Sequence, residues 1–212
     1  MNARDTGLRL NAILAEAGLD PLDQQTASRF EGYLSLYLRW NTRLNLSAIR
    51  DENDIISRHF VESIAVARAL PQGVSTLLDF GSGAGLPGVP IAICRPEIAV
   101  TLAESQGKKA AFLQEAVRVL GIRATVHAER AETLRAVFDC VVLRAVDKMP
   151  KAVAVAARLV GPKGWLVLMT TASRLDELKG AAGAEFSWTT RKQLAGATDR
   201  IIALGARRSQ RA

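Results

Sequence analysis

The chain has 212 residues, of which 49% are hydrophobic and 5% aromatic, enough for one large domain or for a domain with an appendage. No apolar run approaches the roughly 20 residues that span a membrane, and the N-terminal segment MNARDTGLRL lacks the apolar core of a signal peptide, so the composition predicts a soluble, cytoplasmic protein. The formal net charge is +7, and the surplus of Lys and Arg lies within residues 71–212, which favours a polyanionic partner.

Residues 1–72 are expected to form a helical N-terminal cap. Asp20 suits the N-cap of a helix that runs from Leu22 to about Leu44. Large apolar side chains recur along this helix near helical spacing and predict a buried stripe: Phe30, Tyr33, Leu34, Tyr37, Leu38 and Trp40. A further helix is expected over Asn53–Leu70.

From residue 73 onwards short apolar strands alternate with helices, which is typical of a doubly wound α/β fold with a mostly parallel sheet. The expected strands are Thr76–Phe80, Ala99–Ala103, Ala124–His127, Asp139–Arg144, Trp165–Thr170, Phe186–Thr190 and Ile201–Leu204. The clearest helices between them are Lys108–Leu120 and Pro150–Val160. The sequence therefore predicts that residues 73–212 form a Rossmann-like domain around a seven-stranded sheet.

The first strand runs into a glycine-rich turn, LLDFGSGAGLPGVP, at Leu77–Pro90. Its glycines are Gly81, Gly83, Gly85 and Gly88. Glycine permits a positive φ and lets a ligand approach main-chain N–H groups, while the helix that follows adds a partial positive charge at its N-terminus. The turn therefore predicts a nucleotide-like cofactor at the end of the first strand.

Two cofactors compete for this turn. Gly83–Gly88 fits the dinucleotide pattern GxGxxG, with Glu104 about 20 residues further on. Asp79–Gly85 fits DxGxGxG, the pattern of S-adenosylmethionine (SAM) methyltransferases. A carboxylate at Asp79 would repel a pyrophosphate but suits the ammonium and sulfonium groups of SAM. Pro87 also removes one N–H from the turn. We therefore favour SAM.

Ligands of such sheets lie at the carboxyl ends of the central strands. Residues that follow different strands should therefore line one pocket: Gly81–Leu86, Glu104, Ala131, Glu132 and Arg144. Glu104 is placed to accept hydrogen bonds from ribose hydroxyls. The adenine should lie near Ala131 and Glu132, and Arg144 should stand beside the reactive methyl group.

No metal site is expected. The histidines, His59 and His127, are too few and too far apart to form one. Cys94 and Cys140 lack ligand spacing and are interpreted as reduced core residues.

The chain resembles the bacterial ribosomal RNA small subunit methyltransferase G family, also known as glucose-inhibited division protein B. The matching segments are Asn45–Ser63, Leu77–Glu97, Val100–Ile122, Arg130–Glu132 and Phe138–Val146. The resemblance implies a class I SAM-dependent methyltransferase that methylates N7 of a guanine in 16S rRNA of the small ribosomal subunit. It also implies SAM contacts from several of the residues named above: Gly81, Leu86, Ala131, Glu132 and Arg144.

Four basic residues are predicted to bind the RNA substrate. The motif match places Arg58 and His59 at the mouth of the cofactor pocket, and Lys108 and Lys109 form a basic pair that suits an RNA surface. The chain departs from the family pattern at Met169–Thr171, and again within residues 197–202. These departures concern RNA docking more than the cofactor.

Guanine N7 carries a free lone pair and no proton, so a general base is not required. Arg144 is therefore expected to position the reactants and act electrostatically. Two alternatives remain open. A nicotinamide-dependent oxidoreductase would need a catalytic Tyr–Lys, His or Cys near the fourth strand, where the sequence offers none. A ribosome-assembly factor could instead bind SAM without catalysis.

Overall fold

The structure is a computed structural model that describes residues 4–47, 49, 51–192 and 199–208. The family departure at Ala197 and Thr198 lies outside these residues. Within the described ranges, no helix combines the length and the apolar character that crossing a membrane requires.

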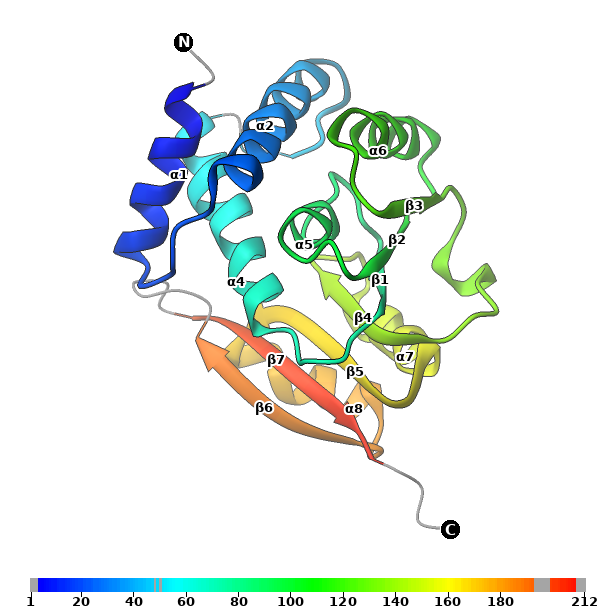
Figure 1. Cartoon of the computed structure of the whole chain (residues 1–212). Helices are drawn as coiled ribbons and strands as arrows, with labels where there is room; N and C mark the ends of the chain where they lie inside the picture. The colour runs from blue at the N-terminus through cyan, green and yellow to red at the C-terminus, as the bar shows by residue number, and fades with distance from the viewer. Residues whose placement is uncertain (1–3, 48, 50, 193–198, 209–212) are drawn as a thin grey trace.

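The described residues form one sheet with the strand order β3-β2-β1-β4-β5-β7-β6 (Figure 1). The strands are β1 (Thr76–Phe80), β2 (Ala99–Ala103), β3 (Ala124–His127), β4 (Phe138–Arg144), β5 (Val160–Thr171), β6 (Phe186–Lys192) and β7 (Arg200–Arg207). Strands β1 to β5 pair in parallel, and β7 runs antiparallel to β5 and to β6. The predicted doubly wound, mostly parallel seven-stranded sheet is confirmed.

Helices cover both faces of this sheet (Figure 1). They are α5 (Gly88–Cys94) and α6 (Gly107–Leu120) on one face, with α7 (Met149–Leu159) and α8 (Leu175–Ala182) on the other. Short 3-10 turns follow β3 and β5, at η2 (Ala131–Thr133) and η3 (Ala172–Arg174). Neighbouring residues of a strand point to opposite faces, so Leu77 enters the core beneath α5 while Leu78 enters the core beneath α7.

The N-terminal elements pack on the α5 face. They are α1 (Arg4–Glu16), α2 (Gln24–Leu44), α3 (Glu52–Ile55), the π-helix η1 (Ile56–Val61) and α4 (Glu62–Ala69). The single helix expected over Asn53–Leu70 is thus interrupted by a π-helical segment, a feature that often marks functional sites.

The expected N-cap at Asp20 is wrong, because the carboxylate of Asp23 caps α2 by accepting the N–H of Thr26 at 2.8 Å. The side chain of Asn11 binds both the N–H and the carbonyl of Leu22, which holds that residue outside the helix. The helix therefore begins later than its Asp-Pro pair indicated.

The predicted aromatic stripe of α2 is largely buried and joins the cap to the sheet domain. Tyr33 stacks on Phe60 with ring centroids 5.1 Å apart, and it also contacts Phe112 of α6. Its hydroxyl donates to the carbonyl of Ala84, in the glycine turn, at 2.6 Å. The predicted division at residue 72 thus separates two sets of elements that share one continuous core.

Candidate active site

The glycine turn between β1 and α5 uses its glycines in two different ways. Gly83 has a φ of +56°, and a Cβ built on it would meet no atom closer than the carbonyl oxygen of Gly81, at 3.9 Å. Gly85 has a φ of +84°, but a Cβ there would come within 2.7 Å of Val89 and 2.9 Å of the Tyr33 hydroxyl. Gly83 therefore keeps a space open, whereas Gly85 permits close packing beneath the turn.

Asp79 lies under the turn. Strand alternation places it on the same face as Leu77, and its side chain is only 1% exposed. Its carboxylate accepts the N–H of Gly88, at the start of α5, at 3.0 Å. Burial raises the pKa of Asp79 to about 7. Because this carboxyl group already binds the first N–H of α5, the turn does not offer that helix N-terminus to a pyrophosphate.

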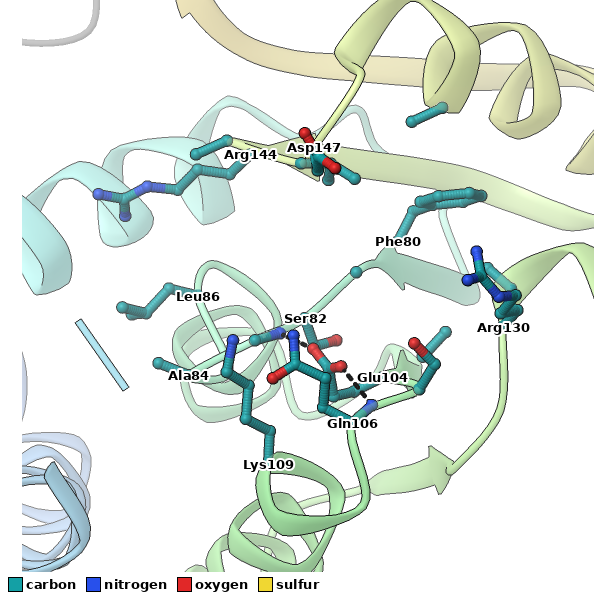
Figure 2. Close-up of a pocket in the computed structure, with 18 of the residues that line it drawn as sticks. Phe80, Ser82, Ala84, Leu86, Glu104, Gln106, Lys109, Arg130, Arg144 and Asp147 are labelled. Atoms are coloured by element: carbon teal, nitrogen blue, oxygen red, sulfur yellow. Dashed lines mark hydrogen bonds between the residues drawn. The ribbon is translucent and has the colours of Figure 1, made fainter. Parts of the chain in front are cut away.

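Glu104 follows β2 and holds the turn from the side. One oxygen of its carboxylate accepts the N–H of Gly83 at 2.9 Å, and the other accepts the N–H of Gln106 at 2.7 Å (Figure 2). An ionised carboxylate has about four lone-pair positions, so Glu104 can accept further hydrogen bonds from ligand hydroxyls. Its surroundings fit a sugar better than a phosphate, which a buried carboxylate would repel.

A cavity of about 720 Å³ opens above the turn at the carboxyl edge of the sheet. Its size falls within the range of cofactor sites, roughly 300–1,000 Å³. The predicted site residues that line it are Gly81, Gly83, Leu86, Glu104, Ala131, Glu132, Arg144, His59 and Lys109. Four others do not line it: Asp79 and Gly85 lie beneath the turn, and Arg58 and Lys108 lie outside.

Several lining residues were not predicted from the sequence. They are, among others, Phe80, Gln106, Arg130, Asp147 and Lys151. Phe80 and Arg130 adjoin the predicted residues Gly81 and Ala131, and this position could have identified them. Gln106 lies two residues after Glu104, and Asp147 lies in the loop after Arg144, at the upper side of the cavity in Figure 2.

Arg144, at the end of β4, extends toward the N-terminal helices (Figure 2). Its guanidinium donates to the carbonyl of Arg58 at 3.0 Å and to Nδ1 of His59 at 2.9 Å, and it pairs with the carboxylate of Glu62 at 3.2 Å. The π-helix η1 and the start of α4 supply all of these partners. Arg144 is therefore fixed in one orientation beside the cavity.

The contact with Arg144 defines the tautomer of His59. A guanidinium can only donate, so Nδ1 of His59 accepts, and Nε2 carries the proton that it donates to the Ser47 hydroxyl at 3.0 Å. Burial, together with the positive charge of Arg144, lowers the pKa of His59 to about 4. The imidazole is therefore neutral at pH 7, and it helps to hold the Arg144 guanidinium in place by accepting its hydrogen bond.

Glu62 is the acidic centre of this cluster. It is 4% exposed and lies between Arg144 and Arg200, the first residue of β7, and it forms ion pairs with both. Among the described residues, no group of three or more His, Cys, Asp or Glu side chains has the arrangement of a metal site.

Comparison with known proteins decides the family. A profile of the rRNA small subunit methyltransferase G family matches residues 26–198. The protein of that name from Xanthomonas euvesicatoria is 40% identical over 171 residues, which cover 79% of this chain and 78% of the other. The one from Roseiflexus sp. is 43% identical over 157 residues, covering 68% and 67%. The chain belongs to this family.

Membership of the methyltransferase G family confirms the resemblance found in the sequence, and with it a SAM-dependent methyltransferase as the class of enzyme. Solved structures agree on the fold. An O-methyltransferase from Bacillus cereus, in complex with SAH, superposes with a TM-score of 0.62 at 15% identity and covers 98% of this chain and 100% of that one. One from Klebsiella pneumoniae gives 0.61 at 15% identity, covering 98% and 99%.

Proposed function

We propose that the protein transfers the methyl group of SAM to N7 of a guanine in 16S rRNA of the small ribosomal subunit, in the cytoplasm. The observation that carries the proposal is the cavity at the carboxyl edge of the sheet, where the glycine turn and Glu104 meet in a member of the methyltransferase G family. The cavity combines an open main-chain turn with a buried carboxylate, which suits a nucleoside without phosphates.

The position of each predicted cofactor residue in the structure supports a specific role in SAM binding. Glu104 would accept hydrogen bonds from the ribose hydroxyls with the lone pairs that Gly83 and Gln106 leave free. The backbone of Gly81–Leu86 would lie against the cofactor, and Ala131 and Glu132 would lie beside the adenine. Asp79 would act indirectly, through the N–H of Gly88, by holding α5 and the turn in place.

Methylation of guanine N7 makes few demands on the protein. SAM, when bound, supplies an electrophilic methyl group on its sulfonium. The acceptor has a free lone pair, so the protein needs no general base and has to align the reactants and exclude water. Arg144 suits this positioning role, because its contacts with Glu62 and His59 fix it. His59 is neutral and already committed to Arg144, and we assign it no proton transfer.

Basic residues around the cavity support an RNA substrate. Lys109, Arg130, Lys148 and Lys151 line its rim, and Lys108 is exposed nearby. Lys and Arg side chains bind nucleic acids mainly through phosphates, and they position the strand without reading its sequence. We assign Lys108 and Lys109, with Arg58, to the RNA side of the site, and His59 would serve that side only indirectly, through its hydrogen bond with Arg144.

The test is methyl transfer from labelled SAM to small ribosomal subunits purified from cells that lack the protein. Mass spectrometry then identifies the methylated nucleoside and its position. Label in N7-methylguanosine of 16S rRNA is the expected result. SAM binding without transfer to any rRNA would instead favour the assembly factor that binds SAM without catalysis, and label in a different nucleoside would overturn the N7 assignment.

A further inference from the structure

A second, smaller cavity lies on the other side of Arg144. It measures about 250 Å³ and is lined by Glu62, Met149, Met169, Thr170, Arg174 and Arg200, among others. This volume is below the range of pockets for whole cofactors, roughly 300–1,000 Å³, and suits a single base. Arg144 and Ala145 line both cavities, so the two sites meet at the end of β4.

The register of the sheet explains why this second cavity forms. Arg144 pairs with Met169 across β4 and β5, and Thr171 pairs with Arg200 across β5 and β7. The ends of β4 and β5 therefore meet the start of β7 at the same edge that carries the first cavity. At the junction Ala145 has a φ of +48°, a left-handed conformation that is costly for a residue with a Cβ and is concentrated at functional sites.

Glu62 presents unused hydrogen-bonding capacity to this second cavity. One carboxylate oxygen accepts from Arg200, and the other pairs with Arg144 at 3.2 Å. An ionised carboxylate has about four lone-pair positions, so acceptor positions remain after these two contacts. Glu62 is 4% exposed and lines the second cavity, so a ligand there could reach these remaining positions. The two arginines fix the carboxylate in one orientation.

Guanine is the base that complements a fixed carboxylate. Its Watson–Crick edge carries two adjacent donors, N1–H and the N2 amino group, whereas adenine and cytosine present a ring acceptor there and uracil presents a single donor. This edge lies on the side of the purine away from N7, so a contact with it leaves N7 free to react. The thioethers of Met149 and Met169 add polarizable groups of the kind that pack well against aromatic rings.

The geometry points to Glu62 as the residue that selects the acceptor base, by accepting hydrogen bonds from N1–H and the N2 amino group of guanine in this second cavity. The inference rests on the proposed function, because it names the substrate contact of the same reaction. Arg144 then has two tasks, since it closes the cofactor cavity on one side and orients Glu62 on the other. Arg174 and Arg200 make the second cavity positive, which suits an RNA strand.

The experiment is a cycle that combines a protein variant with a base analogue. Small subunits are reconstituted with inosine in place of guanosine at the methylated position. Inosine lacks the N2 amino group and keeps N7. With the wild-type protein, kcat/KM for inosine should fall about 5- to 150-fold, the range of a good base contact. In Glu62→Gln, guanosine should lose a similar factor, and inosine should then cause little further loss.

The matched control is Glu115→Gln, which removes another carboxylate paired with an arginine, Arg39, and neither residue lines either cavity. It should discriminate against inosine as the wild type does. SAM titration and circular dichroism confirm that each variant is folded. If Glu62→Gln is not, Glu62→Asp keeps the charge between Arg144 and Arg200 but withdraws it from the base.

Two results would overturn the inference: equal rates on guanosine and inosine with the wild-type protein, or undiminished discrimination in a folded Glu62 variant. Either would leave the proposed function standing, provided that the wild-type protein forms N7-methylguanosine. The absence of N7-methylguanosine from every wild-type reaction would instead remove the proposed function, and this inference with it.

Discussion

The two cavities beside Arg144 are built in different ways. The first is lined by residues as far apart as Ser47 and Lys151, but its floor is one short stretch of chain, the glycine turn after β1, with Glu104 added from the next strand. The second brings together residues from distant parts of the sequence, such as Glu62 and Arg200, which are 138 residues apart. A cofactor site made from local main-chain geometry can therefore be recognised in a sequence, whereas a substrate site formed by tertiary contacts cannot.

The most severe loss is expected at the local site. Gly83→Val should abolish SAM binding, because the new side chain would enter the open space of the first cavity. Isothermal titration with SAM measures the effect. The control is Gly18→Val, since Gly18 also has a positive φ, +70°, and open space around it but lines neither of the two cavities described above. Both variants carry the same backbone cost, about 1–2 kcal/mol. Unaltered SAM affinity in Gly83→Val would refute the site.

The second prediction tests how much the contacts of Arg144 with Glu62 and His59 stabilise the fold. Arg144→Met removes one partner of the buried Glu62 and the donor to His59, and it should lower the free energy of unfolding by about 3–5 kcal/mol. Arg39→Met breaks an exposed pair with Glu115 and should cost at most about 1 kcal/mol. Urea denaturation compares the two variants, and equal losses would mean that the Arg144 cluster is no more than a surface ion pair.

The third prediction uses pH to test the ionisation of Asp79, which lies beneath the glycine turn. Asp79 has a pKa of about 7 in the folded protein against 3.8 ordinarily, so the folded state binds more protons between these values. Its stability should therefore fall as pH rises from about 4 to about 7, with a slope on the order of 1.4 kcal/mol per unit. Asp79→Asn has no titratable proton at this position, so its stability should not fall in this way as pH rises.

Stability is compared for the wild type and Asp79→Asn at pH 5 and pH 8. His59 works in the opposite direction, because its pKa is lowered from 6.5 to about 4, so its contribution to stability grows as pH rises through that window. His59 is present in both proteins, and its effect cancels in their difference. Parallel pH profiles would show that Asp79 ionises normally.

These contrasts also explain what the sequence could predict. The bounds of β1 and the composition of the glycine turn follow from local rules, namely a short continuous apolar run, typical of a strand covered on both faces, and positive φ. Local rules failed where tertiary contacts decide, as at Asp23, which caps α2 because Asn11 holds the preceding segment. The π-helix Ile56–Val61 and the place of Glu62 have no local signature either, because both depend on packing against β4 and β7.

The mildest change is expected on the exposed rim of the first cavity. Lys108→Glu with Lys109→Glu should weaken RNA binding and reduce the slope of log K against log salt by about 2, one for each phosphate that a lysine no longer neutralises. SAM affinity should change little, since the glycine turn and Glu104 are untouched.

Arg158→Glu with Lys163→Glu is the charge-matched control, because Arg158 lies in the last turn of α7 and Lys163 near the start of β5, at the opposite edge of the sheet. Filter binding at several salt concentrations compares the pairs. If both lower the slope equally, RNA is attracted by net charge alone, and the rim of the cavity has no special part in docking.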